Sequence, residues 1–366
     1  MKKLAFLLLI PILLLSLTSC GDRAADLSDH KIAVFYYSFE DAFLTEVRIN
    51  LNDELTSLRV PYENYDAKND QETQNRQIQK ALEGGADLLL VNVVSSGVSA
   101  AAETVIGLAG NTPVVFFNRS IEQPDTANSL FDRYGNIAFV GTESGKAGHM
   151  QGELIGGYLL EHYAETDLDG DGSIRYVMLM GSETSPECVL RTRYSVEDAD
   201  GILRAKGFGG LSYFDPAIPE GYQADPKGTW SEAAAREIMT GDLERFNDSG
   251  NNMIELVICN NDAMAVGAVA ALQAIGYNHG DPAKTIPVFG IDATDVAQAL
   301  IRDGLIAGTV RQSTKDMALA LGTAAKELLL GRSPANAVAA AAKLDQLFAV
   351  DSGHSNKLLV AYTSYP

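Results

Sequence analysis

The sequence predicts an α/β protein with a parallel, doubly wound sheet in each of two lobes. Short apolar runs alternate with amphipathic or Ala-rich segments along the chain, which is the βα alternation of parallel sheets. The clearest apolar run, 254–259, contains one charge, Glu255, as expected of a strand buried on both faces. The chain has 366 residues, more than one core usually supports. Two lobes are therefore expected.

The N-terminus has the three-part layout of an export signal. Lys2 and Lys3 precede an apolar run over 4–17, which is short for a membrane-spanning helix. The sequence LTSC at 17–20 resembles the bacterial lipobox, in which the cysteine becomes the lipidated first residue. We expect residues 1–19 to be a lipoprotein signal peptide, Cys20 to carry lipid and 20–30 to be a tether. An ordinary cleaved signal is the alternative.

The charge of the chain excludes several partners. Its formal net charge is −20, and loss of the two N-terminal lysines would make it −22. Such an acidic surface repels nucleic acid and anionic lipid head groups, so membrane contact is expected through the lipid anchor alone. Beyond Cys20 the cysteines are Cys188 and Cys259, whose spacing suggests neither a metal nor a redox motif. We expect Cys259 to be a buried apolar residue and Cys188 to lie in a loop.

The first half of the chain reads as alternating strands and helices. The apolar or β-branched runs predict strands that begin near residues 32, 60, 86, 113 and 137. Between them, helices are expected from about 41 to 58, 71 to 83 and 97 to 110, the second closed by paired glycines. This order builds a parallel sheet from successive βα units.

The second half repeats the pattern. Helices are expected over 145–163, after Trp230, and over 262–274, 294–303 and 315–331, with Asp262 placed like an N-cap. Strands are expected over 174–181, 210–215, 254–259, 286–292, 305–310 and from 358 onward. The segment GSETSPECVLRTRY at 181–194 is read as a loop.

Polar side chains follow three of the predicted strands. Asn118, Asn261 and Asp292 each stand at a strand end, where open α/β sheets bind ligands. Carboxylates accept from hydroxyls and amides both donate and accept, so these groups suit a polyol such as a sugar. N-capping of the following helix is the alternative for any one of them.

Several motifs give the chain a resemblance to a known family. VVFFN at 114–118, NNDAMAVGAV at 260–269, IPVFGIDA at 286–293 and AGTV at 307–310 resemble the galactose/glucose-binding proteins of bacterial ABC importers, in the type I periplasmic binding protein superfamily. The resemblance implies two Rossmann-like lobes joined by three crossings, near 138–142, 308–313 and 358–362. It places the N-terminal lobe at 31–139 and 312–360, and the C-terminal lobe at 140–311 and 361–366.

The resemblance also implies a sugar site between the lobes. It makes Asp41 a ligand of a sugar hydroxyl and places Phe43 and Trp230 on opposite faces of a pyranose, whose C–H-rich faces suit aromatic rings. Trp230 is the only tryptophan, and a role as core anchor is its alternative. The remaining implied contacts that keep the family residue type are Asn118, Arg191, Asn261 and Asp292. For Arg191 a surface salt bridge is the alternative.

Three positions depart from the family pattern. Ser185 stands where the family usually has His, Glu187 where it has Asp, and Gln312 where it has Asn. Glu187 and Gln312 keep the chemical group on a longer arm, whereas Ser185 is shorter, so water would fill the gap or the hydroxyl there would be read differently. These changes leave the exact sugar open.

An acidic loop resembles the front half of an EF-hand calcium loop. Asp167, Asp169 and Asp171 occupy positions 1, 3 and 5, with Gly at position 6 and the backbone carbonyl of Ser173 at position 7, as in oxygen-ligated Ca²⁺ loops. The resemblance to the binding proteins implies Glu255 as the closing carboxylate.

The ninth loop position is Arg175, where the family supplies an oxygen ligand. An arginine cannot ligate a cation. Either Ca²⁺ binds with water at the vacant place, or Arg175 substitutes for the cation among the carboxylates; a solvated acidic turn is a third possibility. We expect structural Ca²⁺, because four carboxylates exceed the charge of one guanidinium.

The expected function is capture of D-glucose or D-galactose by a lipid-anchored, monomeric binding protein. It would deliver the sugar to an ABC importer permease and signal to a chemoreceptor from the extracytoplasmic face. A sensor without a transport role, or a binding protein for another monosaccharide, is the alternative. An effector domain of a transcription factor lacks support, since an export signal replaces the DNA-binding headpiece. A glycosidase would need two carboxylates flanking one bond, whereas Asp41 and Asp292 are expected to accept sugar hydroxyls.

Overall fold

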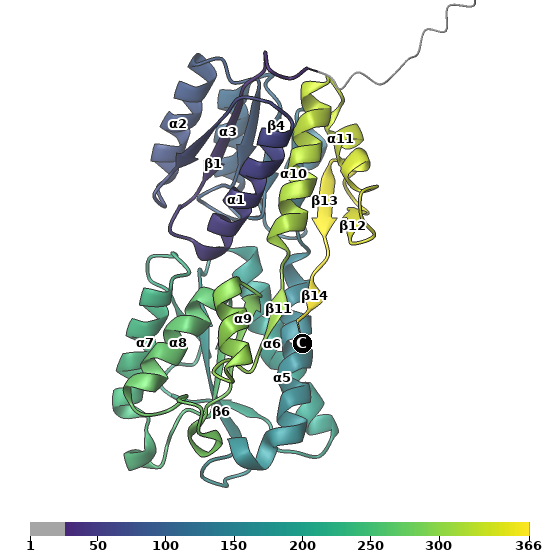
Figure 1. The fold of residues 1–366 in the computed structure, drawn as a ribbon. Coiled ribbons are helices and arrows are strands. Elements are labelled where there is room, and N and C mark those ends of the chain that lie inside the picture. Colours follow the sequence, from purple (N-terminus) through teal and green to yellow (C-terminus); the bar gives the residue numbers. More distant parts are fainter. Residues whose placement is uncertain (1–25, 366) are drawn as a thin grey trace, which may run out of the picture.

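The computed structural model describes residues 26–365, which form two lobes stacked end to end (Figure 1). Each lobe is built on a seven-stranded sheet, so the predicted α/β class with two lobes is confirmed. The predicted signal peptide and Cys20 lie outside the described residues. No helix of the described part is long and apolar enough to cross a membrane.

The N-terminal lobe contains strands in the order β12-β13-β5-β4-β3-β1-β2. The pairs are parallel except β12 with β13 at the edge. Its strands are β1 (Ile32–Tyr36), β2 (Tyr62–Asp66), β3 (Leu88–Val91), β4 (Val114–Phe117), β5 (Ile137–Gly141), β12 (Phe348–Val350) and β13 (Lys357–Val360). Its helices are α1 (Ala42–Ser57), α2 (Gln71–Glu83), α3 (Ser99–Ala109), α4 (Leu130–Arg133), α10 (Thr314–Leu329) and α11 (Pro334–Ala341).

The C-terminal lobe contains strands in the order β14-β11-β10-β9-β6-β7, with β8 paired to β6. Again one edge pair, β11 with β14, is antiparallel. The strands are β6 (Ile174–Met180), β7 (Leu211–Tyr213), β8 (Gln223–Ala224), β9 (Leu256–Cys259), β10 (Val288–Asp292), β11 (Gly308–Arg311) and β14 (Thr363–Ser364). The helices are α5 (Ser144–Thr166), α6 (Pro186–Ala205), α7 (Glu232–Arg245), α8 (Asp262–Ala274) and α9 (Asp295–Arg302), with 3₁₀ turns at Asp248–Gly250 and Pro282–Lys284.

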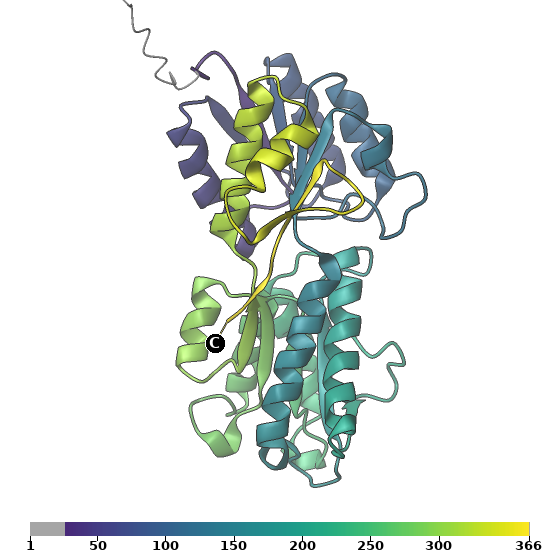
Figure 2. The ribbon, with the colours of Figure 1, turned by 90° about the vertical axis from the view of Figure 1, so that its right-hand side faces the viewer.

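The chain crosses between the lobes three times (Figure 2). The crossings are 142–143, between β5 and α5; 312–313, between β11 and α10; and 361–362, between β13 and β14. The first boundary predicted from the resemblance, between 139 and 140, falls inside β5. The strand continues to Gly141 because Phe117 and Val140 still pair across β4 and β5.

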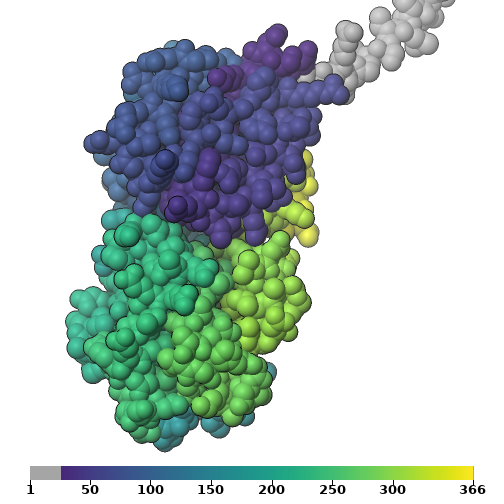
Figure 3. Space-filling model, turned by 60° about the vertical axis from the view of Figure 1, so that its left-hand side comes forward, coloured from purple at the N-terminus to yellow at the C-terminus, as the bar shows by residue number. Residues whose placement is uncertain are grey.

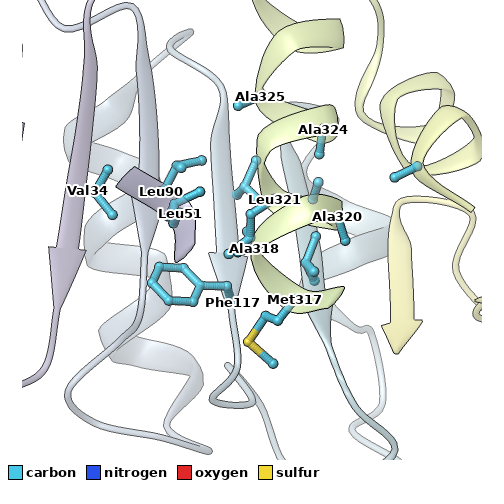
Figure 4. Close-up of a cluster of buried hydrophobic side chains, with 14 of the residues drawn as sticks. Val34, Leu51, Leu90, Phe117, Met317, Ala318, Ala320, Leu321, Ala324 and Ala325 are labelled. Atoms are coloured by element: carbon cyan, nitrogen blue, oxygen red, sulfur yellow. The ribbon is translucent and has the colours of Figure 1, made fainter. Parts of the chain in front are cut away.

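Helix α10 contributes much of the N-terminal core. Its alanines pack against the sheet together with Leu321, as Figure 4 shows for Ala318, Ala320, Ala324 and Ala325 beside Val34, Leu90 and Phe117 of the strands. Helix α10 thus returns the chain to the first lobe after the second crossing and buries an alanine-rich face there. Leu27, expected in the tether, is also buried in this core, so the fold begins before Lys31.

Two local predictions were wrong. The segment 181–194 is not a loop, because α6 begins at Pro186 and buries Cys188. The N-cap of α8 is Asn261 rather than Asp262. Asp262 is instead fully buried, where it accepts hydrogen bonds from Thr309 Oγ1 at 2.7 Å and from Thr294 N at 2.8 Å. The carboxylate that the local pattern assigned to the cap is therefore bound by Thr309 of β11 and by the N-cap residue of α9.

Candidate functional site

A cavity lies between the lobes, which meet across the middle of the molecule (Figure 3). All ten residues predicted to contact a sugar line it, although they come from distant parts of the chain. The lining residues are Tyr37, Asp41, Phe43, Asn118 and Arg119 from the N-terminal lobe, Thr142 and Gln312 from the crossings, and Ser185, Glu187, Arg191, Trp230, Asn261 and Asp292 from the C-terminal lobe.

Three cavity residues have backbone conformations that L-amino acids rarely adopt. The φ angles are +61° at Asn118, +57° at Trp230 and +131° at Asp292. Asn tolerates the left-handed region, but a bulky Trp and an Asp at this φ are strained. Asn118 and Asp292 stand at the ends of β4 and β10, where the strained backbone turns the chain beside the cavity. Such strain persists where the surrounding structure holds it, and it is typical of binding and active sites.

Arg191 joins the cavity to the crossings. Its Nη1 donates to Asn260 O at 2.8 Å, and its Nη2 donates to Gln312 Oε1 at 3.0 Å and to Tyr362 Oη at 2.9 Å. Tyr362 in turn lies 2.8 Å from Thr142 Oγ1. Arg191 is 4% exposed, so the predicted buried guanidinium is confirmed, and it forms no salt bridge with any of residues 26–365.

Three buried nitrogen–hydrogen groups at the cavity have no hydrogen-bond partner among the described residues. They are Nε of Arg191, Nε1 of Trp230 and Nε2 of Gln312. A buried donor without a partner costs free energy, about 1–3 kcal/mol each by mutational measures, and natural proteins leave few of them. Three on one cavity indicate a ligand with several acceptor oxygens.

Asp292 adds an acceptor to this set. Its carboxyl group is buried, and burial raises its pKa well above the ordinary value even though Arg191 opposes the shift. A ligand hydroxyl that donates to the carboxylate would replace part of the hydration that Asp292 loses on folding. The cavity therefore offers unpaired donors and a desolvated acceptor together.

The two predicted aromatic residues lie in the cavity wall, one from each lobe. Phe43 is 6% exposed and Trp230 is 9% exposed. Trp230 also packs with Met180 and Cys188, and its ring lies so close to Gly181 that a Cβ there would clash with Cδ2 of the indole. Trp230 is thus both a core anchor and a cavity residue, and glycine at 181 makes room for the indole.

Two predicted contacts also serve the fold. Asp41 caps α1 through Leu44 N at 2.7 Å and accepts from the Tyr37 hydroxyl at 2.6 Å. Asn261 caps α8 and donates to Trp230 O at 3.1 Å. The capping alternative is therefore correct for Asn261, and Asp41 is a helix cap that was not predicted. Neither cap excludes ligand contact, because a carboxylate or amide has further hydrogen-bonding capacity.

Ser185 and Glu187 have a different arrangement from the other predicted contacts. Ser185 occupies the N-cap position of α6, but its side chain makes no capping hydrogen bond. Its hydroxyl donates instead to Glu187 Oε2 at 2.7 Å. Glu187 also accepts from Ser120 and Ser96 of the other lobe. Both side chains line the cavity but are already engaged with protein.

Sequence reasoning missed three lining residues, Tyr37, Arg119 and Thr142. The Arg119 guanidinium lies 3.5 Å from the Tyr37 ring centroid and donates to Val94 O at 2.7 Å. Arg119 follows Asn118 directly at a predicted strand end, and Tyr37 ends the first apolar run, so their positions at the ligand-binding edge could have identified them.

The acidic loop at 167–175 forms a second charged cluster. Carboxylate oxygens of Asp167, Asp169 and Glu255 lie within 4.8 Å of one another. The guanidinium of Arg175 is placed among them, 2.6 Å from Asp169 Oδ2, 3.1 Å from Glu255 Oε1 and 3.3 Å from Asp171 Oδ2. The hydrogen bond from Arg175 lowers the pKa of Asp169.

Most oxygens of the cluster are paired within the protein. Glu255 is fully buried and also accepts from the backbone N–H groups of Leu168 and Arg175, at 2.9 and 2.7 Å. Asp167 Oδ1 is the exception, since it is buried without a partner among the described residues. Ca²⁺ takes roughly six to eight oxygen ligands, and with the guanidinium in this place the residues do not fit the ion. The geometry favours the interpretation in which Arg175 substitutes for a cation.

Comparison with known proteins adds the family. Residues 32–333 match the model of the periplasmic binding protein domain. The chain belongs to the periplasmic binding protein family. Members of this family bind solutes and are not enzymes, so the predicted binding protein is confirmed and a glycosidase is excluded.

Relatives of this periplasmic binding protein are named for different small polyols. It is 33% identical to a D-galactose/methyl-galactoside binding periplasmic protein of Haemophilus influenzae, over 84% of this chain and 83% of that protein. It is 24% identical to a ribose import binding protein of Bacillus subtilis, over 76% and 75%. A Caulobacter myo-inositol binding protein has the same fold, with a TM-score of 0.62, 20% identity and coverage of 93% and 94%.

Proposed function

We propose that this protein captures a hexose, D-galactose or D-glucose, in the cavity between its lobes and presents it to the permease of an ABC importer. The observation that carries the proposal is the set of buried, unpaired donors of Arg191, Trp230 and Gln312 on the same cavity as Asp292. A pyranose has hydroxyls around its rim for such groups and C–H-rich faces for Phe43 and Trp230.

The choice of hexose rests on two further points. The relative with 33% identity is named for galactose, and the predicted contacts Asp41, Asn118, Asn261 and Asp292 all line the cavity. A different monosaccharide is the second candidate, since another relative is named for ribose import.

We also propose that the protein works on the extracytoplasmic face of the membrane as a lipid-anchored monomer. LTSC at 17–20 supports lipidation of Cys20, and closed lobes would present one joined surface to a permease or a chemoreceptor. Replacement of Cys20 by Ala should move the protein from the membrane fraction to the soluble extracytoplasmic fraction. An unchanged distribution would exclude the lipid anchor.

The central experiment is calorimetric titration of the chain from Gly21, which contains every described residue. D-galactose, D-glucose and D-ribose are compared under the same conditions. We expect one-to-one binding of a hexose that is at least tenfold tighter than binding of ribose. Folded protein that binds ribose best would replace the hexose proposal with a pentose, and absence of binding to all three would overturn it.

A further inference from the structure

Glu187 is the most completely bonded carboxylate at the cavity. Its Oε1 accepts from Ser120 N at 2.9 Å and Ser120 Oγ at 2.5 Å, and its Oε2 accepts from Ser185 Oγ at 2.7 Å and Ser96 Oγ at 3.2 Å. A carboxylate has about four lone-pair positions. All four contacts are made by protein, which leaves little capacity for a ligand.

These contacts join the two lobes. Glu187 and Ser185 lie at the start of α6 in the C-terminal lobe, whereas Ser96 follows β3 and Ser120 follows β4 in the N-terminal lobe. Ser120 is 67 residues from Glu187 in sequence and Ser96 is 91 residues away. Three of the four bonds therefore form only when the lobes are in contact.

Burial strengthens this bridge. Glu187 is 7% exposed and Ser96 is 3% exposed, so water competes little for the bonds, and hydrogen bonds to a charged acceptor are stronger than neutral ones. Three other interlobe bonds involve more exposed groups: Asn69 Nδ2 to Lys227 O at 2.9 Å, Gln123 Nε2 to Thr184 O at 3.2 Å and Asp295 N to Glu46 Oε1 at 3.3 Å. The buried Tyr37 hydroxyl also crosses between the lobes, but it makes a single, longer bond to an uncharged acceptor, Thr229 O at 3.3 Å.

We propose that Glu187 is an interlobe latch that holds the lobes together through Ser96 and Ser120, positioned by Ser185, and is not a ligand contact. Because its bonds are made by protein, the latch favours the closed lobes by the same amount for every ligand. Selection among sugars is left to the unpaired groups of the cavity. The latch therefore changes the affinity for all sugars alike and does not change which sugar is preferred.

The affinity test rests on the proposed hexose function. Dissociation constants for D-galactose and D-glucose are measured for the wild type, Glu187→Ala, Glu187→Asp, and the double variant Ser96→Ala/Ser120→Ala. Glu187→Ala should weaken both sugars by roughly tenfold, from the loss of charge-assisted bonds, with their ratio unchanged. Glu187→Asp keeps the charge but shortens the arm, and should weaken both sugars in the same way. The exposed Glu183→Ala, in the same segment, is the matched control and should leave both constants unchanged.

Combining the variants from the two lobes tests the interlobe hydrogen bonds more directly than the single variants do. In the chain that carries Glu187→Ala, adding Ser96→Ala/Ser120→Ala should cost little more, because the partners have already been lost. Additive losses, or a shift of more than about threefold in the galactose-to-glucose ratio on Glu187→Ala, would show a ligand contact and overturn the latch.

Small-angle X-ray scattering of ligand-free protein tests the latch without any sugar. Both Glu187→Ala and Ser96→Ala/Ser120→Ala should increase the radius of gyration relative to the wild type and to Glu183→Ala. Curves identical to that of the wild type would overturn the proposal. If the wild type bound no hexose, the proposed function would fail while this measurement still decided the latch.

Discussion

The interlobe cavity and the acidic loop at 167–175 both hold charged groups, but they differ in how many of those groups are paired within the protein. In the cavity, Nε of Arg191 and the side-chain nitrogens of Trp230 and Gln312 are buried without partners. In the loop, the guanidinium of Arg175 contacts three carboxylates, and of the Asp167 carboxylate only Oδ1 is buried without a partner among the described residues. Unpaired buried donors call for a ligand, whereas a paired cluster already stabilises the fold. Pairing therefore distinguishes a binding site from a structural site more directly than residue type does.

The largest effect that we expect is a loss of stability when the Arg175 guanidinium is removed from the acidic loop. Arg175→Gln leaves the buried Glu255 and its neighbours without a counter-charge, which should cost about 3 kcal/mol of unfolding free energy. Gln also supplies an oxygen ligand, so millimolar Ca²⁺ should restore much of the loss. Thermal unfolding with Ca²⁺ or a chelator measures both effects.

The wild type provides the contrast for this test. Its melting temperature should not respond to the chelator, and the exposed Arg193→Gln on α6 should change stability by less than about 0.5 kcal/mol. A wild type that loses stability on chelation would restore the calcium prediction and show that Arg175 moves aside for the ion.

The next largest effect is expected on hexose affinity when the Asp292 carboxylate, an acceptor in the cavity, is replaced. Asp292→Asn removes a carboxylate that accepts from ligand hydroxyls, and should weaken hexose binding by about 100-fold. Titration calorimetry measures this, with the exposed Asp295→Asn at the start of α9 as the matched control. Affinity within threefold of the wild type would exclude Asp292 as a ligand contact.

The Asp292→Asn variant should also change how the folding stability depends on pH. Burial raises the pKa of Asp292 above its unfolded value near 3.8, so between these two pKa values the folded state holds a proton that the unfolded state lacks. Folding stability then falls as pH rises through that window. Relative to Asp292→Asn, the wild type should lose stability as pH is raised from about 4 toward neutrality. If the difference in unfolding free energy between the two proteins does not change with pH, the raised pKa of Asp292 is contradicted.

Much of the cavity could be predicted from sequence because strand ends are local signals. Asn118, Asn261 and Asp292 each follow an apolar run, and parallel strands bring such ends to one edge. Local signals also misled: Asp262 looks like a cap, but Thr294 and Thr309 from neighbouring elements bind its carboxylate. Helix α6 was missed even though Ser185 precedes a proline, as at many helix starts.

The contacts that decide function in this chain are long-range. Whether Glu187 reaches a sugar or Ser120 depends on a contact across 67 residues, and no periodicity encodes it. In the same way, the sequence gives the charge of Arg175 but not its place among the carboxylates. In the cavity and in the acidic loop, the sequence therefore predicted which residue types are present, but not which side chains form hydrogen bonds or ion pairs with one another.

The smallest expected effect separates the two roles of Trp230. Trp230→Phe keeps an aromatic face against a sugar but removes the unpaired Nε1, whereas Trp230→Ala removes both. We expect Ala to weaken hexose binding by at least about 1 kcal/mol and Phe to weaken it by less. Titration calorimetry measures both, and circular dichroism checks that the packing on Gly181 survives. Equal losses would assign the contribution to the indole nitrogen, and no loss in either variant would leave Trp230 as a core anchor alone. In the wild type, the fluorescence of this sole tryptophan should change when hexose binds, since the ligand would lie against its ring.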